Sequence, residues 1–125
     1  MNKINVLVVP VKGLVAPKEI SPTLEAMQAL VGGYIERVVI NKLADRTIVL
    51  YVNEEGIATE EINPRISQSL GIPFLGQPLH GQAFIVAETG PEGDLDSLTV
   101  EEMLTLSIRL ESGEPLLRDV RRYDN

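Results

Sequence analysis

The polar side chains best placed for ligand recognition in this sequence lie in the segment Asn63-Pro64-Arg65. The proline restricts the backbone between an amide, which donates and accepts hydrogen bonds, and a guanidinium, which can form paired bonds with phosphate or carboxylate. Two interpretations stay open. Either the segment binds an anionic ligand, or Arg65 pairs within the chain and braces the loop. The possible internal partners are Glu54, Glu55 and Glu60.

Three further candidates for ligand contacts lie upstream. Tyr34 offers a ring for stacking, and Asn53 and Glu54 open the turn at 53–56. The Asn53 amide either braces its own turn or contacts a ligand. Neighbouring side chains of an extended segment point in opposite directions, so Glu54 and Glu55 are a poor pair of ligands for one metal ion.

His80 is the single histidine, and the chain has no cysteine. We interpret His80 as a backbone-bonded or half-buried residue, with a catalytic base as the alternative. Without cysteine there is no disulfide, thiolate nucleophile or cysteine-based zinc site. We therefore expect a protein that is not an enzyme, with no catalytic residues, metal site or cofactor. His80 completes a predicted ligand-binding set with Tyr34, Asn53, Glu54, Asn63 and Arg65.

Charge and hydropathy narrow the possible partners. The 125 residues include 18 acidic and 11 basic side chains, a net charge of −7. Such a chain gains little from releasing counterions on nucleic acid, so we expect no nucleic-acid partner. The apolar run at 4–9 is too short for a signal-peptide core or a membrane span. We expect a cytoplasmic protein without a membrane partner.

These residues must be positioned by strands and two well-marked helices. Apolar or alternating runs predict strands at 4–9, 34–40, 47–52 and 82–87, the middle two forming a hairpin, and a short extended piece at 16–20. Ser21-Pro22 predicts the start of a helix that ends at Gly32. Thr99 and Glu102 predict a capping box for a helix that ends at Gly113. Residues 60–70 fit a short helix or turn, 72–81 a loop and 89–94 a turn.

The order of elements predicts one α+β domain, with a mixed or mostly antiparallel sheet of about four strands and two main helices on one face. We place the domain at 1–113. A tail at 114–125 with a small basic cluster is expected to be flexible or to pack on a partner.

Several motifs in order resemble the DUF3846 family of small uncharacterised proteins. They are TLEAMQ (23–28), VGGYIE (31–36), NEEG (53–56), NPR (63–65), LHG (79–81) and GD (93–94) followed by Leu98. The resemblance covers about Ile4 to Leu110. It implies an origin on phages or plasmids and a bacterial cytoplasmic setting, without implying a reaction.

Two functions follow as expectations. The first is non-enzymatic binding of a small nucleotide-like or anionic ligand, which could sequester a host immune signal. The second is a protein-interaction module that inhibits or adapts a host protein through a sheet edge or the tail around Arg118 to Arg122. Homo-oligomerisation is compatible with both, because open strand edges can pair between chains.

Overall fold

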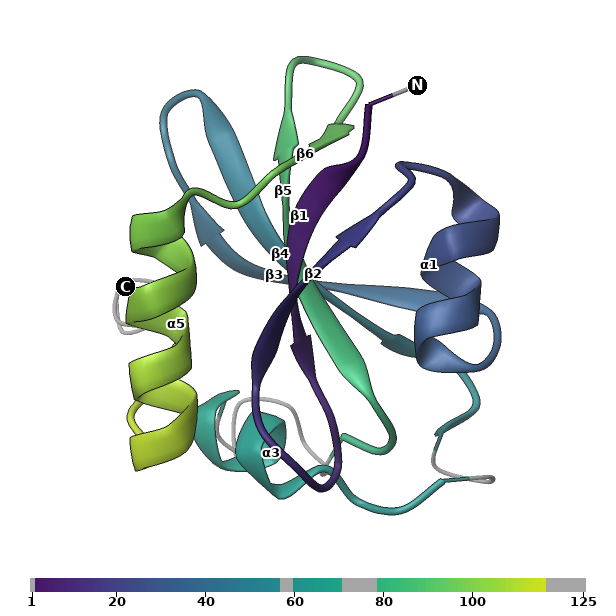
Figure 1. Cartoon of the computed structure of the whole chain (residues 1–125), viewed down its shortest axis with the longest axis vertical. Helices are drawn as coiled ribbons and strands as arrows, with labels where there is room; N and C mark the ends of the chain where they lie inside the picture. Colours follow the sequence, from purple (N-terminus) through teal and green to yellow (C-terminus); the bar gives the residue numbers. More distant parts are fainter. Residues whose placement is uncertain (1, 57–59, 71–78, 117–125) are drawn as a thin grey trace, which may run out of the picture.

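The computed structural model describes residues 2–56, 60–70 and 79–116 (Figure 1). The predicted loop at 72–81 and the predicted tail lie largely outside these residues. The strands are β1 (Ile4–Val9), β2 (Ala16–Ile20), β3 (Ile35–Lys42), β4 (Arg46–Asn53), β5 (Ala83–Thr89) and β6 (Asp94–Asp96). The helices are α1 (Leu24–Val31), α3 (Pro64–Leu70) and α5 (Val100–Ser112).

All strands belong to one antiparallel sheet. Five of them follow the order β2-β1-β5-β4-β3, and β6 pairs with β5 beyond this path. The α+β class and the β3–β4 hairpin are therefore confirmed, and the extended piece at 16–20 is the edge strand β2. The expected number of about four strands was too low. β2 is largely exposed and β6 has three residues, so neither carries a strong apolar pattern.

The two central strands are buried on both faces of the sheet. Side chains alternate between the faces along a strand. On β4, Leu50 points to one face while Val49 and Tyr51 point to the other, and all three are buried. β5 behaves in the same way. A sheet with two apolar faces must be covered on both sides.

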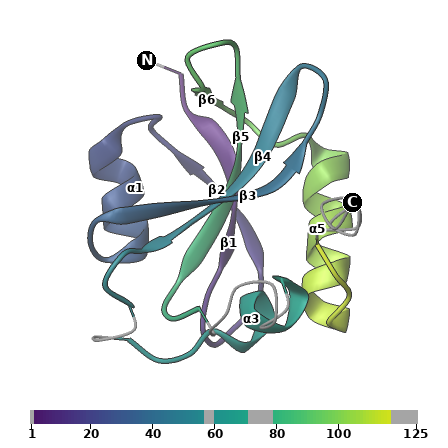
Figure 2. The same cartoon turned by 180° about the vertical axis from the view of Figure 1, so that it is seen from behind.

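Helices cover both faces, so the prediction of two helices on one face was wrong. Figures 1 and 2 show α1 on one side of the sheet and α5 on the other, with α3 beside the end of α5. The apolar cluster on the α5 side of the sheet is called the first core, and the cluster on the α1 side the second core. The first core contains Leu106 and Leu110 of α5 and Ile66 of α3. Met27 and Val31 of α1 pack into the second core. The sequence shows an apolar stripe on each helix but not which face of the sheet it meets.

The helix ends follow their local sequence, with one exception. Thr99 and Glu102 form the predicted capping box of α5, and Gly113 ends α5 in a left-handed conformation (φ 77°). Gly32 ends α1 in the same way. The N-cap of α1 is Thr23, whose hydroxyl accepts a hydrogen bond from Ala26 N, rather than the predicted Ser21. Two residues with capping side chains stand close together here, and the later one caps the helix.

Candidate functional site

Asn63 lies in the interior, where the chain itself occupies its amide. The residue is fully buried. Its Nδ2 donates to the carbonyls of Val9 (3.0 Å) and Gly81 (2.9 Å), and its Oδ1 accepts from Ile66 N (3.3 Å). These bonds tie the start of α3 to β1 and to the entry of β5. They supply the bracing contacts that were one of the two interpretations of this segment.

Arg65 also makes internal contacts, although with a different acid from those expected. Its Nε donates to Glu111 Oε1 on α5 (3.1 Å), and its other nitrogens donate to the carbonyls of Pro10 and Gly13. The guanidinium therefore joins α3, α5 and the β1–β2 connection. The carboxylate with which Arg65 forms an ion pair is therefore Glu111, 46 residues away in the sequence.

Tyr34 and Asn53 do come together, at the end of α1. They line a pocket of about 310 Å³ whose other lining residues are Gln28, Gly32, Gly33 and Glu55. Tyr34 is 67% exposed, so its ring is accessible. Asn53 is buried, and its Oδ1 accepts from Glu55 N (2.8 Å), which confirms that it braces its own turn. Glu54 is exposed, and its N–H donates to the carbonyl of Tyr34 (2.8 Å).

His80 is joined to the same region through Glu60. His80 Nδ1 lies 2.8 Å from the Glu60 carbonyl oxygen, and Glu60 Oε1 accepts from Asn53 Nδ2 (3.0 Å). Gly81 has a φ of +83°, and a Cβ there would lie 2.5 Å from Glu60 Oε1. His80 is thus half-buried and backbone-bonded, as interpreted from the sequence. The six predicted residues do not share one pocket. Tyr34 and Asn53 line one, Asn63 is buried, and Arg65 is half-buried and bonded to Glu111.

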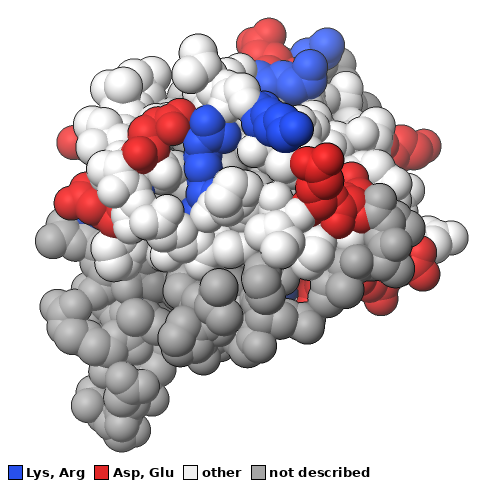
Figure 3. Space-filling view, turned by 90° about the horizontal axis from the view of Figure 1, so that it is seen from below, with Lys and Arg blue, Asp and Glu red and all other residues white. Residues whose placement is uncertain are grey.

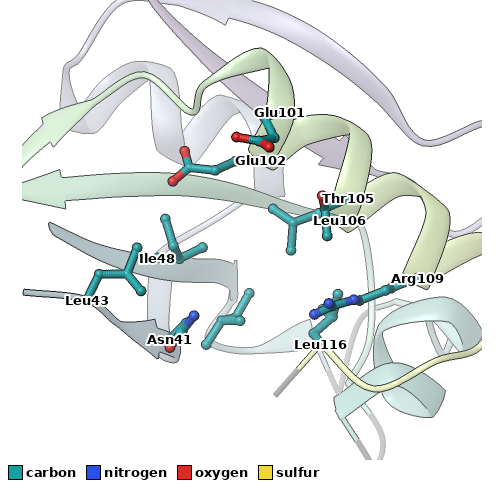
Figure 4. A pocket seen from close by; sticks show the side chains of 10 residues that line it. Asn41, Leu43, Ile48, Glu101, Glu102, Thr105, Leu106, Arg109 and Leu116 are labelled. Carbon is teal, nitrogen blue, oxygen red and sulfur yellow. The ribbon is translucent and has the colours of Figure 1, made fainter. Parts of the chain in front are cut away.

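A larger pocket, which sequence reasoning did not find, lies between α5 and the β3–β4 hairpin. Its volume is about 510 Å³. Figure 4 shows Glu101 and Glu102 at one end and Arg109 with Leu116 at the other. The lining residues are Ile40, Asn41, Leu43, Ile48, Glu101, Glu102, Thr105, Leu106, Arg109 and Leu116. A bulge between Val39 and Asn41 shifts the register of β3, and both Ile40 and Asn41 line this pocket.

Arg109 differs from the other arginines that the structure describes. Arg37 pairs with Glu88 (2.6 Å), Arg46 with Glu102 (2.9 Å) and Arg65 with Glu111 (3.1 Å). Within the described ranges, the Arg109 side chain has no carboxylate or carbonyl partner. The residue one turn earlier is Thr105, where a glutamate would have formed an i, i+4 pair. The guanidinium of Arg109 therefore lines the pocket without a counterion among the residues that the structure describes.

Three of the polar residues that line the pocket form one ridge of α5. Glu101, Thr105 and Arg109 stand at i, i+4 and i+8, so they lie on the same side of the helix. Eight residues of helix rise about 12 Å, which is too far for Glu101 to pair with Arg109. Glu101 and Arg109 carry opposite charges eight residues apart, and the position four residues before Arg109 holds Thr105 rather than an acid. This pattern is the sequence signal that could have found the site.

Another polar cluster lies on the α1 face of the sheet. Glu88 is buried and accepts hydrogen bonds from Tyr51 Oη (2.6 Å) and from Arg37. Burial favours a higher pKa for Glu88, but the bonds from Arg37 and Tyr51 outweigh burial and hold its pKa below the usual value of a glutamate. Burial and the bond to Glu88 raise the pKa of Tyr51 to about 12. Glu88 on β5 is thus hydrogen-bonded to Arg37 on β3 and to Tyr51 on β4, and these bonds link the three strands.

No group of three or more histidine, aspartate or glutamate residues is arranged to hold a metal ion in the described part of the chain. No described helix combines the length and the apolar character needed to cross a membrane.

Comparisons with known proteins give one result. A family model described as a domain of unknown function, DUF3846, matches residues 3–111. No curated protein and no solved structure matches the chain. The match includes most of α5 and the whole β3–β4 hairpin, so both walls of the larger pocket fall within it.

Proposed function

The chain belongs to the DUF3846 family, and because no activity is attached to that family, we propose a function from the pocket itself. The protein is a non-enzymatic binder of a small anionic ligand, held between α5 and the β3–β4 hairpin. Such a binder acts by lowering the free concentration of its ligand, which is the sequestering role expected from the phage or plasmid origin that the family resemblance implies.

The observation that supports this proposal most directly is Arg109, whose side chain has no partner in the described part of the chain. A guanidinium forms its strongest bonds with phosphate and carboxylate groups, through two parallel N–H donors. Arg109 is partly buried beside apolar side chains, where an ionic bond is screened less than on an open surface. Asn41 lines the same pocket and can donate a further hydrogen bond.

The size and walls of the pocket suit an organic anion. A volume of about 510 Å³ falls within the usual range of small-molecule sites. Ile48 and Leu106 are buried members of the first core and give the pocket an apolar floor. An inorganic ion would leave this floor in contact with water. A ligand with an anionic group and an apolar body uses both parts of the site.

The test is calorimetric titration of the wild-type protein with inorganic phosphate, AMP and citrate, followed by Arg109→Gln. We expect at least one organic anion to bind, and Arg109→Gln to weaken it about tenfold or more, since charge-assisted bonds are strong. Arg109→Lys should recover part of the affinity, because lysine keeps the charge but loses the paired donors.

The matched control is Lys18→Gln. Lys18 is exposed on β2 and its substitution changes the net charge equally. Arg109 also lies in the last turn of α5, where a cation favours the helix dipole, so thermal unfolding must accompany each titration. Failure of every anion to bind, or equal binding by folded Arg109→Gln, would overturn the proposal.

The second candidate is a protein-interaction module, and one observation favours it. Val100, Leu104 and Ile108 form an exposed apolar stripe on α5, with 70%, 60% and 63% of their surfaces exposed. Two such helices running antiparallel bring Val100 against Ile108 and Leu104 against its own copy, so the partner we propose is a second copy of this chain. Light scattering after size exclusion tests this. A dimer in the wild type that becomes a monomer in Leu104→Gln supports it, and a wild-type monomer at high concentration rejects it.

A further inference from the structure

Resting on the proposed function, we propose that the pocket selects an anion whose opposite end carries an amino group. The ligand class is a nucleoside monophosphate with an exocyclic amine, of which AMP and CMP are the simplest forms. Its phosphate lies at Arg109 and its amine at Glu101.

Glu101 supplies the second recognition group. Like Arg109, it lines the pocket and has no ion-pair or hydrogen-bond partner in the described part of the chain. An ionised carboxylate only accepts hydrogen bonds. It therefore favours a ligand edge that donates, such as an amine, and disfavours an edge that presents a carbonyl oxygen.

Glu102 is already committed and does not share this role. Its Oε1 accepts hydrogen bonds from Arg46 (2.9 Å) and from the backbone N–H of Thr99 (2.9 Å). The acidic end of the pocket therefore contains one carboxylate balanced by the protein and one available to a ligand. Figure 4 shows both at the end of the pocket remote from Arg109.

The distance between the two recognition groups excludes the smallest ions. Glu101 and Arg109 are separated by about 12 Å along the helix axis. Thr105 stands between them on the same ridge, and Leu106 and Ile48 lie beneath. A ligand that meets both charges needs a long body with an apolar face and one polar edge. A base joined to a sugar phosphate has this form.

The experiment compares two matched pairs of nucleotides, AMP with purine riboside 5′-monophosphate and CMP with the corresponding 2-pyrimidinone nucleotide. Within each pair the phosphate is identical, the exocyclic amine is replaced by hydrogen and the neighbouring ring nitrogen stays an acceptor, whereas in IMP and UMP that nitrogen is itself an N–H donor. We expect wild-type protein to bind the amine member roughly tenfold more tightly, as one well-made polar contact allows. In Glu101→Gln, whose amide both donates and accepts, the ratio should fall to about twofold or less.

Glu25→Gln is the control for Glu101→Gln. Glu25 is exposed in the first turn of α1, so its substitution has the same effect on net charge and on a helix start. It should leave both nucleotide ratios unchanged. Amide chemical shifts recorded during titration should change at Asn41, Thr105 and Arg109.

The outcomes separate this inference from the proposed function. Equal affinity for the members of each pair, with binding that still depends on Arg109, overturns the amine selection and keeps the anion site. A preference that persists in Glu101→Gln also overturns it. Absence of binding by all four nucleotides and by citrate overturns the proposed function as well.

Discussion

Glu88 is where the strongest polar contacts of the described residues meet. A buried carboxylate is unfavourable unless hydrogen bonds compensate for lost hydration. Here Arg37 approaches with two nitrogens and Tyr51 with its hydroxyl, so three strands contribute one side chain each. Arg37 keeps about half of its side-chain surface exposed, which leaves the cluster one solvated edge.

Replacing Glu88 by glutamine should destabilise the fold by about 1–3 kcal/mol at pH 7, because charge-assisted bonds are lost and Tyr51 keeps a weaker acceptor. Urea unfolding measures this. The pKa of Glu88 is lower in the folded state than in the unfolded chain, so its contribution is present above the unfolded-state pKa and is lost as pH falls through the folded-state pKa. The stability difference between the two proteins should therefore shrink in strong acid. A difference that stays constant down to pH 2 would contradict this account.

Asn63 allows a direct choice between its two interpretations. Asn63→Ala leaves two carbonyls and one N–H without their partner in the interior, so we expect a loss of about 2–4 kcal/mol in unfolding free energy. Asn63→Asp should cost as much, because a carboxylate cannot donate to Val9 and Gly81. If Asn63→Ala were as stable as the wild type but bound anions less tightly, the residue would belong to a ligand site instead.

At the scale of elements, helix α5 has one apolar side that is buried against the sheet and another that is exposed. Leu110 is buried in the first core, whereas Leu104 is 60% exposed. Leu110→Ala should cost about 2–4 kcal/mol and Leu104→Ala less than about 0.5 kcal/mol. The two variants are matched because the residue change and the helix are the same. The small cost is expected for the monomer, and a large cost for Leu104→Ala that grows with protein concentration would instead support the self-association proposed for this stripe.

The elements that the sequence predicts well are those with strong local signals. The capping box at Thr99, the glycine ends of α1 and α5, and the apolar runs of β1, β4 and β5 all act within a few residues. β6 was not predicted, because Asp94–Asp96 has turn residues and is extended only through pairing with β5. The continuous apolar runs of β4 and β5 did carry a signal for helices on both faces.

The candidate site was harder to predict for a physical reason. Asn63 and Arg65 are chemically able to bind an anion, but Asn63 reaches Val9 and Arg65 reaches Glu111, and both partners are distant in sequence. Arg109 is the reverse case. An arginine in the last turn of a helix usually favours the helix dipole. Only the packing of the β3–β4 hairpin beside α5 makes it a pocket residue.

At the scale of the whole molecule, charge limits what can bind. Figure 3 shows basic side chains interspersed with acidic ones among the described residues of the face seen from below. With a net charge of −7, the protein repels anions at long range. Anion binding therefore depends on local groups such as Arg109. Moderate salt should favour binding by screening the long-range repulsion and should weaken binding by screening the attraction to Arg109.

The central sheet makes the two cores one cooperative unit. Val49 and Leu50 are adjacent on β4, both fully buried, and belong to the α1 side and the α5 side respectively. Because both cores are built on β4, the packing on the α1 side cannot be lost while the packing on the α5 side stays intact. We therefore expect Val49→Ala and Leu50→Ala each to shift a single unfolding transition, by about 1–5 kcal/mol. Far-ultraviolet circular dichroism reports both helices, whereas tyrosine fluorescence is sensitive to Tyr51 on the α1 side. The two signals should give the same midpoint in both variants, and separate midpoints in Leu50→Ala would mean that the α5 side unfolds on its own.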